Sequence, residues 1–223
     1  MVLRHNKLFE NSFSDKGWLV LQKVTSTVNK SEAILAGGTA LAIQLGHRVS
    51  YDLDFFTNKK INVENIIREL NSNFKEIKIM SEDEDTLVAD LEGIKFSIFH
   101  FPYKFIDDIV EFREIRLAGI LDIASMKIIA ITQRGVKRDF VDLYQILTKT
   151  PFYKVAETLV SKYGSNRINP ILIGKALVYF TDAESDPEPN YKSKNSTDWS
   201  KIKKFFKTHV KQFVLDIDQA KRI

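Results

Sequence analysis

Cysteine is absent from the 223 residues of this chain. Its absence excludes a disulfide framework, a zinc site built from thiolates and a cysteine nucleophile. Long hydrophobic runs are missing as well, because lysine and arginine interrupt every apolar stretch before it reaches the roughly 18 to 20 residues of a membrane span. Histidine is scarce, and its four positions have no spacing typical of zinc ligands: His5, His47, His100 and His209.

The N-terminal residues 1–6 lack the apolar core of a signal peptide. Together with the missing membrane span, this predicts a cytoplasmic protein that makes no membrane contact. Hydrophobic residues form 44% of the chain, which is enough for a substantial core in one large or two small domains. The net charge of +4 makes polyanionic partners such as nucleotides or RNA plausible without requiring them.

The first half of the sequence mixes helix and strand patterns. Helical patterns begin at Ser14 and after Asn62, where polar residues suited to capping precede apolar residues at helical spacing. A third, short helix is expected from Thr39 to about Leu45. Strand patterns occupy residues 33–36, 49–56 and segments near 75–80, 86–91 and 94–101, the last two joined by a Glu92-Gly93 turn.

Beyond Pro102 the sequence has only helical patterns. Asp122 is the expected N-cap of the first of them, and a polar connection or mobile loop is expected at 182–190. We therefore predict an α+β fold, with a mixed sheet flanked by helices in residues 1–118 and a helical bundle packed against it in residues 119–223. The other helices of the bundle are expected near 138–148, 151–163, 170–181 and 199–219.

A glycine pair at the end of the strand 33–36 is the first feature that carries chemistry. Gly37-Gly38-Thr39 ends this strand and opens a helix, so backbone N–H groups without obstructing side chains lie at a positive helix end. The threonine hydroxyl would add another donor. Such a turn can hold a phosphate chain, although an isolated Gly-Gly pair is usually only a turn.

Two aspartates follow in the expected strand 49–56. Alternation places Ser50, Asp52 and Asp54 on one face of this strand and Tyr51 on the other. The two carboxylates would be about 7 Å apart along the strand, a spacing suited to hard cations bound through oxygen. An isolated Asp-x-Asp is often a solvated strand face, but its place after the glycine turn indicates a magnesium and phosphate site.

These segments resemble a known protein family. Residues 37–41 (GGTAL) and 46–56 (GHRVSYDLDFF) resemble the first motif of the AbiEii/AbiGii toxin family of nucleotidyltransferases. Residues 122–127 (DIASMK) and 134–144 (RGVKRDFVDLY) resemble the family's lysine-bearing helix and the helix that follows it. The resemblance covers roughly residues 30–150. It implies a DNA polymerase β-like nucleotidyltransferase fold, use of an NTP and Mg²⁺, and a role as toxin beside an antitoxin from an adjacent gene.

The resemblance also implies a nucleotide-binding role for residues of the first motif. Gly37, Gly38 and Thr39 would hold the triphosphate, and Arg48 and Ser50 would shape the site. The expected reaction transfers the NMP part of an NTP to an acceptor, with an RNA 3′ end as the favoured acceptor and a protein hydroxyl or small molecule as alternatives.

Four residues are the candidate catalytic residues on the same basis. Asp52 and Asp54 would bind Mg²⁺, and Lys127 would contact the phosphate or the leaving group. Asp139 would act as a general base or orient Lys127, and the sequence does not choose between these roles. Asp142 is interpreted as an ion pair or a cap beside Arg138.

One position departs from the common pattern of this fold. A third carboxylate often lies on a later central strand, but the corresponding segment 93–99 offers Ser97 instead. Asp90 on the preceding segment is acidic, without a geometric reason to prefer it. An inactive nucleotide- or RNA-binding protein of the same fold therefore stays an alternative to the enzyme.

The expected last helix has two contrasting faces. Its apolar stripe is typical of a helix that packs in a core, and the lysines opposite form a solvated face that could attract RNA phosphates. Binding to a membrane surface fits the same pattern less well. The lysines are Lys201, Lys203, Lys204, Lys207 and Lys211.

Overall fold

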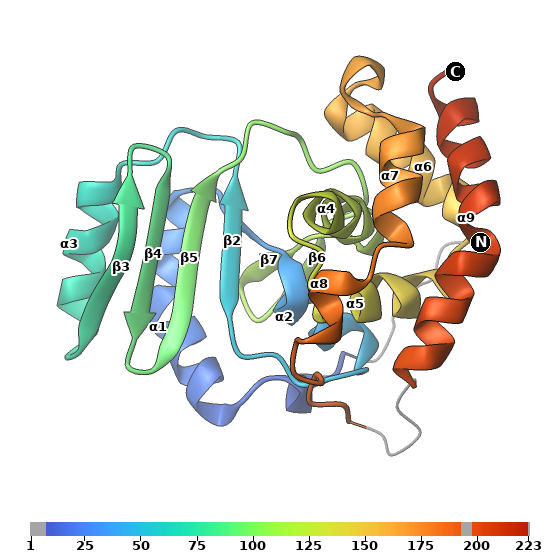
Figure 1. Cartoon of the computed structure of the whole chain (residues 1–223). Coiled ribbons are helices and arrows are strands. Elements are labelled where there is room, and N and C mark those ends of the chain that lie inside the picture. Colours follow the sequence, from blue (N-terminus) through green and yellow to red (C-terminus); the bar gives the residue numbers. More distant parts are fainter. Residues whose placement is uncertain (1–7, 193–197, 223) are drawn as a thin grey trace. The chain divides into compact units, whose positions relative to one another are not determined.

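The structure is a computed structural model that describes residues 8–192 and 198–222 (Figure 1). His5 and residues 1–6, on which the expectation about a signal peptide depends, lie outside the described residues. The chain divides into two compact units. Unit 1 comprises Met1–Lys104 and Ile109–Ala118, and unit 2 comprises Phe105–Asp108 and Gly119–Ile223. The predicted domain boundary between residues 118 and 119 stays a prediction.

Unit 1 contains a seven-stranded mixed sheet in the order β3-β4-β5-β2-β1-β7-β6. Strand β2 pairs in parallel with β5, and β1 pairs in parallel with β7; the other neighbours are antiparallel. The strands are β1 (Ile34–Leu35), β2 (Leu53–Thr57), β3 (Ile77–Asp83), β4 (Thr86–Leu91), β5 (Ile94–His100), β6 (Val110–Phe112) and β7 (Ile115–Leu117).

The helices of unit 1 begin where their capping residues predict. Ser14 caps α1 (Asp15–Lys30) by accepting the Gly17 N–H at 3.0 Å, and Asn62 caps α3 (Val63–Asn73) in the same way. Figure 1 shows α1 and α3 on the same face of the sheet. The short helix α2 (Gly37–Leu45) starts at the glycine pair itself, and its last seven residues are all buried.

Strands β6 and β7 correct the expectation that only helices follow Pro102. Val110, Phe112, Ile115 and Leu117 alternate with charged residues, which is a strand signal, and the positive φ angles of Arg113 and Glu114 form the turn between them. The signal was missed because each strand has only three residues. Strand β7 lies beside β1, so this hairpin completes the sheet next to the glycine pair.

Unit 2 is a bundle in which α4 contacts α5, α6 and α7, and α9 contacts the same three helices. The apolar stripe of α9 packs in this core, as predicted. The ring centroids of Phe206 and Phe140 are 5.6 Å apart, and those of Phe213 and Phe152 are 4.1 Å apart. The helices are α4 (Ile120–Gln133), α5 (Lys137–Leu147), α6 (Phe152–Tyr163), α7 (Pro170–Leu177), α8 (Thr181–Glu184) and α9 (Trp199–Ala220).

Two predicted helix ends in unit 2 were wrong. Asp122 is not the N-cap of α4, because this helix already begins at Ile120 and leaves Asp122 buried in its first turn. The helix expected at 170–181 ends at Leu177, where hydrogen bonds from the N–H groups of residues 178 and 179 to carbonyls three positions earlier tighten the last turn. Among the described residues, no helix has the length and apolarity needed to cross a membrane.

Candidate active site

The glycine pair lets two charged side chains approach the start of helix α2. Gly37 has a φ angle of +64°, and a Cβ atom added there would lie 3.1 Å from Oδ2 of Asp54. A Cβ atom added to Gly38 would lie 2.2 Å from Nη2 of Arg48, which is closer than any real contact. Asp54 and Arg48 therefore lie directly against the turn, and both glycines are needed because a side chain would displace one of them.

The Thr39 side chain forms hydrogen bonds within the protein. Its hydroxyl is buried and lies within hydrogen-bonding distance of the Ser50 hydroxyl, at 2.9 Å, and of the Asp52 carbonyl. A hydroxyl has one proton, so Thr39 donates to the carbonyl and accepts from Ser50. The hydroxyl was expected to add a donor for phosphate, but it forms hydrogen bonds with the segment 50–52. The backbone N–H of Thr39 belongs to the first turn of α2, where N–H groups have no partner within the helix.

The acidic segment enters the sheet later than predicted. Strand β2 begins at Leu53, and Ser50 forms only an isolated bridge with Phe13. Tyr51 is half exposed, whereas Leu53 and Phe55, two and four residues later, are fully buried. The bridge to Phe13 and the hydrogen bonds of Thr39 hold this segment away from the regular strand, and alternation is regular only from residue 52 onward.

Asp52 and Asp54 stay predicted cation ligands, and the structure shows their surroundings. Both are partly exposed, while the intervening Leu53 is fully buried in the sheet. The Asp54 carboxylate faces Gly37, and the buried Arg48 guanidinium faces Gly38. Carboxylate oxygens beside a glycine turn and a fixed positive charge fit a magnesium–triphosphate, in which the cation takes oxygen ligands and the guanidinium faces phosphate.

Ser97 lies beside this group on the neighbouring strand. It is the register partner of Asp54 in the parallel pair of β2 and β5, and it is 1% exposed. Asp90 is used elsewhere, because its Oδ1 accepts the Gly93 N–H at 2.7 Å in the turn between β4 and β5. In residues 8–192 and 198–222, no group of three or more His, Cys, Asp or Glu side chains could hold a metal ion.

The lysine of the second motif lies between two aspartates of helix α5. The Lys127 ammonium is 2.7 Å from Oδ1 of Asp139 and 2.7 Å from Oδ2 of Asp142. The second oxygen of Asp139 is 3.4 Å from Nε of Arg134. Both aspartates are fully buried, so these contacts fix the lysine at its position. Asp142 forms an ion pair, as expected, and Lys127 is a partner that the sequence did not identify.

A second buried ion pair in unit 2 was missed at the sequence level. The Lys162 ammonium is 2.7 Å from Oδ1 of Asp122, and both side chains are fully buried. Oδ2 of Asp122 accepts the N–H groups of Ile106 and Asp107. Burial lowers the pKa of Lys162, and the contact with Asp122 opposes this effect. Lysine and aspartate 40 positions apart give no local signal, so only the bundle reveals the pair.

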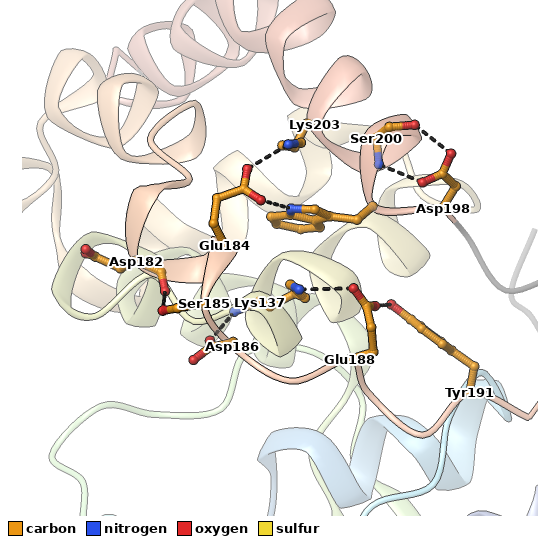
Figure 2. Close-up of polar contacts among 11 residues, drawn as sticks. Lys137, Asp182, Glu184, Ser185, Asp186, Glu188, Tyr191, Asp198, Ser200 and Lys203 are labelled. Carbon is orange, nitrogen blue, oxygen red and sulfur yellow. Dashed lines mark hydrogen bonds and ion pairs between the residues drawn. The ribbon is translucent and has the colours of Figure 1, made fainter.

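The segment expected as a connection between the last two helices is held by polar contacts (Figure 2). Asp186 accepts the backbone N–H of Lys137 at 2.8 Å, at the first residue of α5. The buried Lys137 ammonium is 3.0 Å from Glu188, whose other oxygen accepts the Tyr191 hydroxyl. Acidic side chains thus cover the positive end of the helix that carries Asp139.

Glu184 should make the start of α9 sensitive to acid. Hydrogen bonds from Lys203, at 2.6 Å, and from the Trp199 indole lower the pKa of Glu184 below its ordinary value of 4.5. The folded protein therefore binds this proton less readily than the unfolded chain, so the stabilisation is complete above pH 4.5 and is lost as the pH falls through the lowered pKa. Trp199 fluorescence, recorded in a Trp18→Phe background, should change in that range.

Glu184→Gln is the control for this titration. The amide keeps the shape of the carboxyl group but does not ionise, so the fluorescence change below pH 4.5 should disappear. A transition of the same size and midpoint in Glu184→Gln would assign the change to another group.

The fold of this chain is similar to that of solved structures with low sequence identity. Over 93% of this chain and 92% of the other, it is similar to the nucleotidyltransferase toxin MenT4 (Rv2826c) of Mycobacterium tuberculosis H37Rv, with a TM-score of 0.53 and 14% identity. It is also similar to JHP933 of Helicobacter pylori over 95% of both chains, with a TM-score of 0.52 and 17% identity. The α+β fold of nucleotidyltransferase toxins, as predicted, is therefore the fold of this chain.

The sequence places the chain within one protein family. Residues 20–105 and 97–220 match the family described as nucleotidyl transferase AbiEii toxin, type IV TA system, and the chain belongs to this family. The predicted membership is confirmed. An uncharacterized protein of Aquifex aeolicus (strain VF5) is 38% identical over 203 residues, covering 87% of this chain and 94% of that protein.

Proposed function

We propose that this chain is an active Mg²⁺-dependent nucleotidyltransferase that transfers the NMP part of an NTP to an RNA 3′ end. The observation that carries the proposal is the contact of Asp54 and Arg48 with the glycine turn at the start of α2. Family membership supports the class of reaction. The exposed lysines of α9, Lys201, Lys204, Lys207 and Lys211, support RNA as the acceptor because each could contact a phosphate.

The residues of unit 1 would bind and orient the nucleotide. The first backbone N–H groups of α2 and the Arg48 guanidinium would hold the triphosphate. Asp52 and Asp54 would hold Mg²⁺, which when bound supplies charge neutralisation for the triphosphate. The acceptor hydroxyl would attack the α-phosphorus, the bond from this phosphorus to the bridging oxygen would break, pyrophosphate would leave, and the proton of the hydroxyl would pass to water.

Within unit 2, Lys127 carries a positive charge that is fixed between Asp139 and Asp142. We assign Lys127 to the leaving phosphates, where an ammonium stabilises the negative charge that develops. Asp139 is assigned as a positioning residue, because both of its oxygens already contact cations. This favours orientation of Lys127 over general-base catalysis. Asp142 holds the same ammonium from its other side.

Label transfer from an NTP tests the proposal. The protein would be incubated with each of the four α-labelled NTPs, Mg²⁺ and cellular RNA or protein, and the labelled product would be identified. Asp54→Asn should lower transfer about a thousandfold or more, because a cation ligand is lost. Asp83→Asn, the same change at an exposed position of the same sheet, should leave transfer unchanged. Equal transfer by wild type and Asp54→Asn would refute the proposal.

Gly38→Ala tests the nucleotide site separately. The new methyl group would displace the buried Arg48 guanidinium, so calorimetry should show NTP binding at least about tenfold weaker. The double variant Gly38→Ala/Arg48→Ala has no clash, but it also lacks the guanidinium that would contact phosphate. Its NTP binding should therefore stay weak. Recovery of binding in the double variant would show that Arg48 has no role with the nucleotide.

A binding protein without activity is the alternative that Ser97 favours. Such a protein would take up NTP in a calorimeter but would release no pyrophosphate. The same family membership supports a further proposal, that the chain is the toxin of a toxin–antitoxin pair whose antitoxin is encoded by an adjacent gene. We propose the cytoplasm as its place of action, where NTPs and RNA acceptors are available.

A further inference from the structure

Ser97 occupies a position where a side chain can reach the candidate cation site. In the parallel pair of β2 and β5, Asp54 is opposite Ser97 and Phe56 is opposite Phe99. Register partners point to the same face of a sheet, and the Phe56 and Phe99 rings stack on that face with centroids 5.1 Å apart. The side chain of Ser97 therefore lies on the face of the sheet that carries the Asp54 carboxylate.

The Ser97 hydroxyl is buried and has no hydrogen-bond partner among the described residues. A buried hydroxyl without a partner costs free energy, so packing alone does not explain a serine here. A carboxylate at this position would be next to Asp54 and would give the site a third acidic ligand. Serine keeps the position polar and small but contributes no charge.

The charges around the glycine turn make a weak site for a free cation. Asp52 and Asp54 contribute two negative charges, while the buried Arg48 guanidinium contributes a positive charge beside Gly38. The affinity of an oxygen site for a hard divalent cation rises with the number and charge of its ligands. Two carboxylates with a nearby guanidinium are a weak site, which the oxygens of a triphosphate would complete.

We propose that this protein binds its divalent cation only together with the NTP, and that Ser97 sets this dependence by leaving the site one carboxylate short. The inference rests on the proposed function and deepens it, because it assigns an order of binding to the site. The cation enters with the nucleotide. A single substitution of Ser97 should change the order without changing the other ligands.

Binding of Mn²⁺, measured by electron paramagnetic resonance, tests the proposal on the full-length protein. The wild type should bind Mn²⁺ alone only weakly, and a non-hydrolysable NTP analogue should strengthen binding at least about tenfold. Ser97→Asp should bind Mn²⁺ without nucleotide at least about tenfold more tightly than the wild type. Ser97→Asn, which has the same size as the aspartate but no charge, should behave as the wild type does.

A thermal melt provides a second readout that does not depend on nucleotide. Because a ligand that binds only the folded state raises its stability, Mn²⁺ should raise the Tm of Ser97→Asp more than that of the wild type or Ser97→Asn. This comparison also reveals whether Ser97→Asp is folded. Wild-type protein that binds Mn²⁺ equally well with and without the analogue would overturn the inference, and so would folded Ser97→Asp with unchanged Mn²⁺ affinity.

The outcomes separate this inference from the proposed function. If the wild type binds no NTP analogue even with Mn²⁺, the proposed function fails. The comparison of Ser97→Asp with Ser97→Asn in the absence of nucleotide still decides whether Ser97 limits cation binding. If NTP binds and is transferred but Mn²⁺ binds equally well without it, only the inference fails.

Discussion

Replacement of Lys162 by methionine should lower the free energy of unfolding by about 3–5 kcal/mol, the cost of leaving a buried charge without its partner. The ammonium lies 2.7 Å from Asp122, and neither side chain is exposed. Methionine has a similar length and fits an apolar environment, so the loss would come from the uncompensated carboxylate and not from a cavity. Urea denaturation followed by circular dichroism would measure the difference.

A double-mutant cycle separates the ion pair from its surroundings. Asp122→Asn keeps an oxygen that can accept the N–H groups of Ile106 and Asp107 but removes the charge. Each single variant should be strongly destabilised, and Asp122→Asn/Lys162→Met should be more stable than the sum of the two losses predicts. Additive losses, or a loss below about 1 kcal/mol for Lys162→Met, would contradict the assignment of a buried ion pair.

Lys127→Met should have two large effects. Loss of the ammonium leaves Asp139 and Asp142 buried as like charges, which should cost about 3–5 kcal/mol of stability. Under the proposed function, it should also lower NMP transfer about 100- to 1000-fold, because a positive charge for the leaving phosphates is lost. Denaturant unfolding and the label-transfer assay measure these effects independently.

Asp142→Asn in the Lys127→Met background distinguishes the two effects. The second change removes one of the opposed carboxylates, so part of the stability should return. Transfer should stay low, because no ammonium is restored. If transfer recovers together with stability, Lys127 is structural and has no role with the phosphates.

The fold could be predicted from the sequence where local patterns are strong. Ser14 and Asn62 cap the helices that they were expected to cap, and the turn at Glu92-Gly93 joins β4 and β5 as predicted. The errors fall where tertiary contacts override local preference. The strands β6 and β7 are too short to show a clear alternation of apolar and polar residues. The isolated bridge between Ser50 and Phe13 keeps residue 50 out of β2, which begins only at Leu53.

The candidate site was predictable as a set of residues but not as a set of contacts. The glycine pair and the Asp-x-Asp spacing identified the turn and its acidic neighbour. Sequence spacing could not indicate that Thr39 turns its hydroxyl inward, or that Asp142 shares Lys127 with Asp139. These contacts depend on which side chains meet once the segments have packed, and no local period encodes that.

The short segment 105–108 limits how the gene can be divided. The chain enters unit 2 at Phe105, returns to unit 1 at Ile109 and leaves it again after Ala118. Asp107 accepts the N–H of Leu121, and Asp122 accepts the N–H groups of Ile106 and Asp107. Each of the two segments, 105–108 and the start of α4, therefore accepts hydrogen bonds from backbone N–H groups of the other. A truncation after residue 118 would separate the segment 105–108 from its hydrogen-bond partners in α4. Recombination that exchanges one half between homologous genes would have to keep compatible residues in both segments.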